Sequence, residues 1–198
     1  MSLINKKKKK GTTLVEVIIV MSIMTMIIGL LYPIFISGYR NLIKVSLDND
    51  LKTSATAINK QLSETLVQAT GIIEINDFIK KDVLGNPENL FLEEKVTDVS
   101  RIKVKTLKID GTEEEYEFLL TDKYISGNKE LYSLTVIKDG SSEVISKNIK
   151  SVTVESLEST VTLKNTSSIK ITVELYDKKG LADSEYKIAT ILTFRNKA

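Results

Sequence analysis

The chain opens with a continuous apolar stretch and continues with an amphipathic one. From Leu14 to Ile36 the only charged residue is Glu16, and about 20 apolar residues suffice for a helix to cross a bilayer. Beyond this stretch, apolar residues recur every three or four positions, which predicts one buried stripe of a helix: Leu47, Leu51, Ala55, Ile58, Leu62, Leu66 and Ala69. Because Gly71 is a suitable C-terminal stop, we expect one helix from Thr12 to about Gly71.

After Gly71 the pattern changes from helical to β. Residues 72–92 look irregular, with a breaker at Gly85-Asn86-Pro87. From residue 101 onward, short alternating segments are separated by turn pairs, which predicts successive hairpins and an antiparallel sheet. The turn pairs are Asp110-Gly111, Gly127-Asn128, Asp139-Gly140 and Lys179-Gly180.

Four further strands are expected in the C-terminal half. Residues 149–155 and 160–164 form a candidate pair. Residues 168–176 give the cleanest alternation, and a polar loop then precedes a last strand at about 186–195. The fold class is therefore α+β: a long N-terminal helix, transmembrane in its first half and amphipathic in its second, packs on one or more antiparallel β-sheets.

The charges beside the apolar stretch predict its orientation. Five lysines, residues 6–10, precede it, whereas only Arg40 and Lys44 follow closely. The positive-inside rule then places the N-terminus in the cytoplasm and the chain after about Ile36 outside. A cleaved secretory signal would have a shorter apolar region and a small-residue cut site, and neither is present. On hydropathy alone the segment is a single-pass membrane anchor.

Glu16 is the unusual residue of this anchor. A lone carboxylate at mid-bilayer costs about 2.5–3.5 kcal/mol on insertion scales, so we expect Glu16 to have a partner. The alternative is a carboxylate that stays hydrated or protonated near the membrane surface, since Glu16 lies only two residues into the apolar run.

Composition narrows the function classes. The 198 residues include no cysteine and no histidine, which excludes thiol catalysis, a Ser-His-Asp triad and zinc sites with thiolate or imidazole ligands. We interpret Glu113-Glu114-Glu115 as a solvated strand start, and Asp48-Asn49-Asp50 lacks the spacing of a calcium loop. We therefore expect no enzymatic activity, no cofactor and no metal. The net charge of +2 falls to 2 − 5 = −3 without the five lysines. The remaining chain therefore has no strong positive electrostatic potential that would attract nucleic acid.

The segment from Gly11 to Glu16 resembles the processing site of type IV prepilins and of the related pseudopilins. A basic leader, a glycine, a glutamate five residues later and an apolar helix occur in the same order and spacing. The resemblance implies that a prepilin peptidase cuts after Gly11 and methylates the new N-terminus at Thr12. Pilins most often carry phenylalanine at that position, and Thr12 departs from the pattern, which puts methylation in question more than cleavage.

The resemblance also implies roles for three residues of the helix. Glu16 of one subunit could pair with the charged Thr12 amine of a neighbour, which would make it an assembly residue. Pro33 falls where many pilins have a helix-bending proline, and with Gly29 it should weaken or bend the helix. The C-terminal half is similar in layout to the larger minor pilins and the J-type minor pseudopilins, which sit in a complex at the filament tip.

The expected organisation has four parts: residues 1–11 are a cleaved cytoplasmic leader, 12–36 a transmembrane and assembly helix, 37–71 its amphipathic continuation, and 72–198 an extracellular β-rich head. The expected function is that of a structural minor pilin or pseudopilin of a type IV pilus or related filament. The filament tip is one place where such a subunit could sit. Its partners are other subunits, the prepilin peptidase, the assembly platform and membrane lipid. The composition, with three arginines and abundant lysine, asparagine and isoleucine, suggests an AT-rich Gram-positive bacterium.

Two alternatives stay open. One is a competence pseudopilin in DNA uptake, which would need a basic patch on the folded surface. The sequence disfavours nucleic acid as a partner without excluding it. The other is a membrane-anchored surface binding domain that never polymerises. Cleavage after Gly11 separates the filament subunits from this last alternative.

Overall fold

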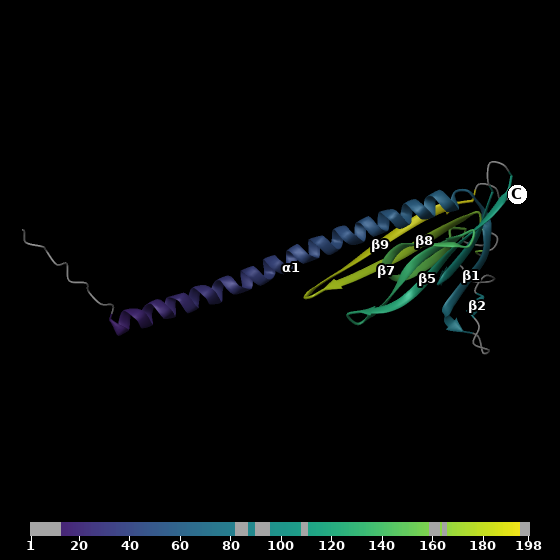
Figure 1. The fold of residues 1–198 in the computed structure, drawn as a ribbon. Helices are drawn as coiled ribbons and strands as arrows, with labels where there is room; N and C mark the ends of the chain where they lie inside the picture. The colour runs from purple at the N-terminus through teal and green to yellow at the C-terminus, as the bar shows by residue number, and fades with distance from the viewer. Residues whose placement is uncertain are drawn as a thin grey trace, which may run out of the picture. The chain divides into compact units, whose positions relative to one another are not determined.

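The computed structural model describes residues 13–81, 87–89, 96–107, 111–158, 163 and 166–194 (Figure 1). The fold is α+β, as the pattern predicts: one long N-terminal apolar helix is followed by an antiparallel, curled β-sheet. The chain divides into two compact units, Met1–Leu42 and Ile43–Ala198.

The helix, α1, begins at Leu14 and ends at Leu66. In the first unit every residue from Thr13 to Leu42 is exposed. In the second unit the predicted stripe is confirmed. Its buried members are Leu47, Leu51, Ala55, Ile58, Leu62 and Leu66.

The strands of the described residues form one sheet of nine. They are β1 (Ala69–Lys81), β2 (Pro87–Asn89), β3 (Val96–Asp98), β4 (Arg101–Leu107), β5 (Glu113–Ser126), β6 (Lys129–Lys138), β7 (Ser141–Ser156), β8 (Ser168–Lys179) and β9 (Ala182–Thr193). Their order is β2-β1-β4-β5-β6-β7-β8-β9, with β3 paired to β7, and every pairing is antiparallel. The turns predicted at Gly127-Asn128 and Asp139-Gly140 are confirmed.

The predicted end of the helix at Gly71 is wrong, and so is the irregular structure expected for residues 72–81 and 87–89. Residues 82–86, with Gly85 and Asn86 of the expected breaker, and residues 90–92 lie outside the described part of the chain. Strand β1 begins at Ala69, which pairs with Thr106 of β4, and continues to Lys81. Gly71 lies at a shift of register in this pairing, a place where a residue without a side chain is often found. The partner strand lies some thirty residues further along the chain, so the local pattern did not reveal it.

Two further expectations differ from the structure. Residues 149–155 belong to β7 and pair with β8 and β3, whereas residues 160–162 and 164 lie outside the described part of the chain. The polar loop expected before residue 186 is the first part of β9, which begins at Ala182. Its buried residues there are the small Ala182 and Ser184, so the alternation carried no apolar signal. The turn residue Asp110 and the expected last strand residue Arg195 lie outside the described residues.

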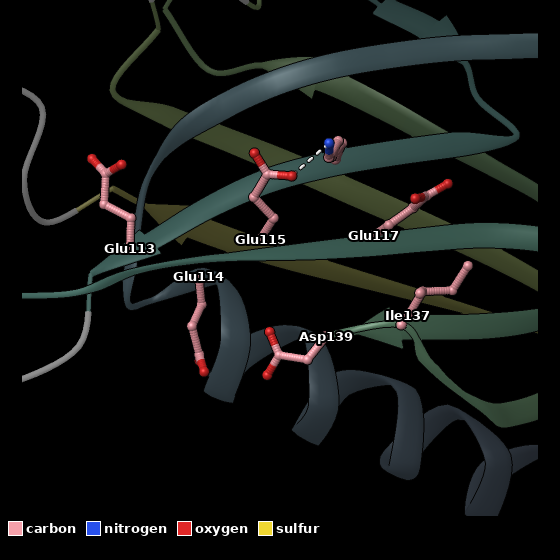
Figure 2. Close-up of a pocket in the computed structure, with 8 residues that line it drawn as sticks. Glu113, Glu114, Glu115, Glu117, Ile137 and Asp139 are labelled. Atoms are coloured by element: carbon pink, nitrogen blue, oxygen red, sulfur yellow. Dashed lines mark ion pairs between the residues drawn. The ribbon is translucent and has the colours of Figure 1, made fainter.

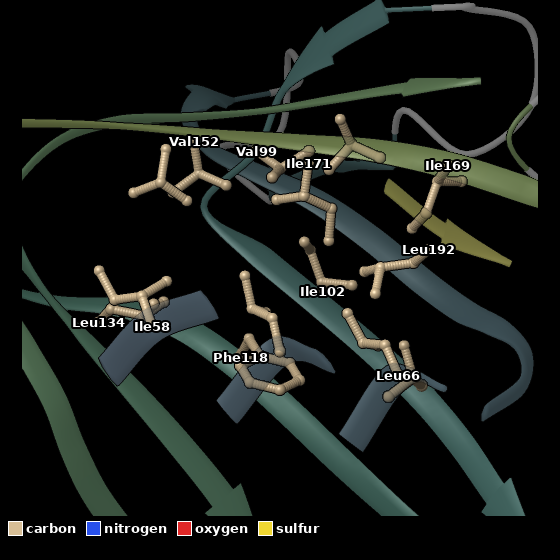
Figure 3. Packing of buried hydrophobic residues seen from close by; sticks show 14 of the residues in the cluster. Ile58, Leu66, Val99, Ile102, Phe118, Leu134, Val152, Ile169, Ile171 and Leu192 are labelled. Atoms are coloured by element: carbon tan, nitrogen blue, oxygen red, sulfur yellow. The ribbon is translucent and has the colours of Figure 1, made fainter. Parts of the chain in front are cut away.

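The core forms between the second half of α1 and one face of the sheet (Figure 3). Ile58 is fully buried, and the cluster around it draws on strands from β1 to β9. In β8 every second residue is buried, and Ile169, Ile171, Val173 and Leu175 share the inner face, as predicted. The helical stripe and the alternating strand residues therefore bury each other, which is what each pattern requires.

Two β-bulges bend the sheet, and one tyrosine side chain makes hydrogen bonds between them. Asp122 in β5 and Asn148 in β7 have φ values of 48° and 68°, and the register of each strand shifts beside them. Bulges increase local twist and bend a strand. The Tyr124 hydroxyl donates to the Asn148 side-chain oxygen and accepts from the Asn148 backbone N–H at 2.9 Å.

Replacing Tyr124 by phenylalanine should therefore destabilise the head. The Tyr124→Phe variant leaves the partly buried N–H and side-chain oxygen of Asn148 without this partner, which costs about 1–3 kcal/mol. Chemical unfolding of the full chain in detergent measures the change. Tyr132→Phe is the matched control, since the Tyr132 hydroxyl donates to the exposed Glu130 at 3.4 Å and its loss should cost less. Equal stability of Tyr124→Phe and the unchanged chain would contradict the role of this link.

Candidate assembly site in the N-terminal helix

The proposed cleavage and methylation sites lie directly before the first residue that the structure describes. Gly11 and Thr12 lie outside the described residues, so cleavage after Gly11 and methylation of Thr12 stay predictions. The description begins at Thr13, and α1 begins with the next residue. Glu16 is among the described residues, so the contacts around it are known.

Thr13 and Glu16 form a reciprocal cap at the start of α1. The Thr13 backbone N–H donates to Glu16 Oε2 at 2.8 Å, and the Thr13 hydroxyl donates to the same oxygen at 3.2 Å. In return the Glu16 backbone N–H lies 3.3 Å from Thr13 Oγ1. This is the capping box, in which a threonine and a glutamate three residues apart satisfy two N–H groups that the first helical turn leaves unpaired.

The cap gives Glu16 a partner in its own chain that the sequence analysis did not identify. The signal was present, since the spacing Thr-x-x-Glu directly before an apolar run is the sequence signature of a capping box. Both hydrogen bonds fall on Oε2, and an ionised carboxylate has lone pairs on two oxygens. Capping is therefore compatible with a second, cationic partner on the other oxygen.

Gly29 and Pro33 act on the same point of the helical hydrogen-bond ladder. Both lie inside α1. A helical N–H bonds to the carbonyl four residues earlier, and proline has no N–H, so Pro33 leaves the Gly29 carbonyl without its usual donor. Nothing lies within 4 Å of a side chain placed at Gly29. The two residues remain the place where we predict the helix to bend.

Within the first unit, residues 17–36 of α1 contain no charged side chain and expose large apolar residues along the whole segment. Among the described residues, α1 is the one helix that is long and apolar enough to cross a membrane. The exposed fraction of Phe35 is 72% and that of Leu14 is 78%, values that water would penalise over so many neighbouring residues. The segment needs lipid or other protein around it.

The acidic run on β5 is neutralised by lysines rather than arranged as a metal site (Figure 2). Lys103 lies 2.6 Å from Glu115, and Lys105 lies 2.5 Å from Glu113. The hydrogen bond from Lys103 lowers the pKa of Glu115. Glu114 points to the other face, where Lys138 lies 3.3 Å away. Neighbouring glutamates of a strand thus face opposite sides, as the pleat requires.

The three residues of the other oxygen-rich run, Asp48-Asn49-Asp50, also have different surroundings. Asp48 accepts a hydrogen bond from the Ser184 hydroxyl, whereas Asn49 and Asp50 are exposed. Within the described part of the chain, no three acidic residues are placed so that they could hold a metal ion together.

The comparisons with known proteins agree with the N-terminal geometry. Residues 6–32 match the family described as the prokaryotic N-terminal methylation motif. The match includes the lysine block, Gly11, Glu16 and Gly29, and it ends one residue before Pro33. No curated protein and no solved structure matches the chain at a significant level. Together with the apolar helix, the motif supports a membrane-anchored, surface-exposed protein, and over this N-terminal segment the chain is similar to type IV pilin-like proteins.

Proposed function

We propose that this chain is a minor structural subunit, a minor pilin or pseudopilin, of a type IV pilus or related filament. The observation that carries the proposal is the methylation motif over residues 6–32, which overlaps the exposed apolar first part of α1 from Leu14 onward. The proposed role is structural and not enzymatic. The extended β-rich head and the threonine at position 12, in place of the phenylalanine most common in pilins, favour a minor rather than a major subunit.

The proposed processing step separates the leader from the assembly helix. A prepilin peptidase cuts after Gly11 and methylates Thr12, so residues 1–11 stay behind in the cytoplasm. Residues 12–36 hold the subunit in the membrane until the assembly platform transfers it to the filament, and the following residues face the outside. The lysine block before the apolar run supports this orientation.

Glu16 is the proposed contact between subunits. After cleavage Thr12 carries a charged amine inside an apolar layer, and Glu16 of a neighbouring subunit can offer the carboxylate oxygen that the Thr13 cap leaves unused. A buried charge is tolerated when it is paired. The bend at Gly29 and Pro33 would let the apolar helices pack along the filament axis.

The N-terminal sequence of the protein extracted from membranes of its native cell tests the proposal. We expect it to begin Thr12-Thr13-Leu14. A Gly11→Val variant should keep its leader, because the glycine before the cut is lost, whereas the matched Gly38→Val variant should be processed normally. Mature protein that begins at Met1 or Ser2 would instead indicate an anchored surface protein that does not polymerise.

A role in DNA uptake is the second candidate from the sequence, and the described surface does not favour it. The lysines of β4 are paired with glutamates of β5. Lys170 of β8 pairs with Glu155, and Lys187 of β9 pairs with Glu174. Such pairs leave little positive potential for phosphates.

A further inference from the structure

Strand β9 is the last strand in the order of the sheet, and in the part of the chain that the structure describes its far edge is unpaired. Its pairing with β8 keeps one register from Ala182, opposite Lys179, to Thr193, opposite Ser168. No bulge therefore turns the edge away, and β9 contains no proline. Bulges and prolines are two of the devices that protect a free edge against added strands.

The backbone hydrogen bonds of β8 show which residues of β9 face the free edge. The Phe194 N–H donates to the Ser167 carbonyl at 2.9 Å. On the other side of β8, the Leu157 N–H donates to the Ser168 carbonyl at 3.1 Å. Because bonded pairs alternate along an antiparallel ladder, the even-numbered residues of β9 bond to β8. The backbone N–H and C=O groups of the odd-numbered residues point away from the sheet: Asp183, Glu185, Lys187, Ala189, Ile191 and Thr193.

The helix contacts β9 through even-numbered residues. Thr190 donates to Asn59 of α1 at 2.8 Å, and Ser184 donates to Asp48. Both Thr190 and Ser184 are buried, whereas every odd-numbered residue of β9 is exposed. The helix therefore lies against one face of the strand, and the row of outward backbone groups borders solvent.

Only the first half of this edge is protected by charge, which Asp183, Glu185 and Lys187 supply. From Ile188 to Phe194 the sequence holds only apolar residues and threonines. A stretch of this length, without charge, proline or glycine, is typical of segments that pair with other strands. In its middle the exposed fraction of Ile191 is 64%.

The geometry of this edge specifies an extended backbone as its partner. The outward N–H and C=O groups of Ala189, Ile191 and Thr193 repeat every second residue, about 7 Å apart, which is the repeat of a neighbouring strand. Main-chain hydrogen bonds supply the affinity in such strand addition, and alternate side chains supply the specificity. A charged side chain beside Ile191 would find no opposite charge there, so the edge suits an uncharged segment.

We propose that the second half of the β9 edge, Ala189–Thr193, accepts an uncharged, extended segment of a neighbouring subunit as an additional strand of the sheet. The source of this strand rests on the proposed function, because a minor subunit has mainly other proteins as its neighbours in a filament. The added strand would join two heads through main-chain hydrogen bonds, in addition to the contact proposed for Glu16.

Amide hydrogen exchange of the full chain in detergent micelles tests the edge residue by residue. The probe is an end-blocked peptide of alternating threonine and valine, long enough to span Ala189–Thr193. Without it we expect fast exchange at Ala189 and Ile191 and slow exchange at Thr190 and Leu192, which bond to β8. With the peptide at about ten times its Kd, exchange at Ala189 and Ile191 should slow about tenfold. The same peptide with a central proline should have no effect.

Three results of this experiment would overturn the proposal. Exchange at Ala189 and Ile191 could stay fast in the presence of the peptide, which would show that the edge accepts no strand. It could be slow without peptide at every protein concentration, which would show that the edge is already covered. It could become slow only as the protein concentration rises, which would assign the edge to a second copy of this chain.

Ile191→Pro tests the same contact in cells that form the filament. The Ile191 N–H points away from β8, so proline removes an outward donor without breaking the ladder. We expect a processed, folded protein that is lost from sheared filaments, whereas Ile191→Thr, which keeps the N–H and adds no charge, should be incorporated. If chemical unfolding shows that the proline variant is destabilised, Ile191→Lys replaces it, because an edge lysine also opposes strand addition. Its matched control is Ile125→Lys, at an isoleucine with an exposed fraction of 72%.

The two proposals fail in different ways. If the unchanged chain keeps its leader or is absent from filaments, the proposed function fails, and with it the neighbouring subunit as the source of the strand. If the unchanged chain enters filaments and the Ile191→Pro and Ile191→Lys variants enter them equally well, the inference about the β9 edge alone is overturned.

Discussion

Glu16→Ala is expected to give a processed, folded and membrane-inserted protein that does not enter filaments. The substitution removes both the capping oxygen for Thr13 and the carboxylate proposed to neutralise the amine of a neighbouring subunit. The capping loss alone costs about 0.5–2 kcal/mol at the helix start. An unpaired amine in an apolar layer costs more, so we expect loss of assembly to dominate. Filaments sheared from cells and probed for this chain provide the measurement.

Two companion variants separate the cap from the charge. Glu16→Gln keeps an oxygen that can accept from the Thr13 N–H but carries no charge, so it should fail to assemble as Glu16→Ala does. Thr13→Ala removes the hydroxyl of the cap and keeps the carboxylate, so it should assemble with at most a modest loss. Assembly of the Glu16→Gln variant together with failure of Thr13→Ala would assign Glu16 to the helix start and contradict a role between subunits.

Ile58→Ala should have the largest effect on the folded head. Ile58 is fully buried, in the middle of the helical stripe and against the inner face of the sheet. Truncating a buried isoleucine to alanine removes apolar contacts and leaves a cavity, at a cost of about 2–5 kcal/mol. That is a large part of the stability of a domain, which is about 5–15 kcal/mol. Chemical unfolding followed by circular dichroism measures the change.

An exposed position on the same helix provides the control. Lys52 is exposed, and Lys52→Ala should change the free energy of unfolding by no more than about 0.5 kcal/mol. If Ile58→Ala and Lys52→Ala destabilise the protein equally, the second half of α1 is not part of the core of the head.

The helix and its two environments could be predicted because each leaves a local pattern. An apolar run without periodicity indicates a segment surrounded by lipid or protein, and a stripe such as Leu51, Ala55, Ile58 and Leu62 indicates one buried side. The glycine-containing turns and the alternation of Ile169, Ile171 and Val173 are local in the same way. The capping box was equally readable from Thr13 and Glu16, and it was missed because Glu16 was interpreted only as a partner for another subunit.

The motif that marks the candidate assembly site could be recognised for a different reason. The order of a basic block, Gly11, Glu16 and an apolar helix is a linear motif, because the peptidase proposed to cut the chain would read neighbouring residues. No tertiary contact is needed to recognise it, and the match over residues 6–32 covers the same segment.

The sequence by itself determined the membrane-length helix, its buried stripe and several of the later strands with the side that they bury. The tertiary structure alone decided that residues 69–81 form a strand and which elements lie beside each other. Alternation shows that a strand has a buried face, but not which strand pairs with it. Ala69 pairs with Thr106, Asp48 accepts a hydrogen bond from Ser184, and Lys44 of the helix lines one cleft together with Lys129 and Asp183. These contacts join residues far apart in the chain, and their register depends on the fit of the whole core, which no local window contains.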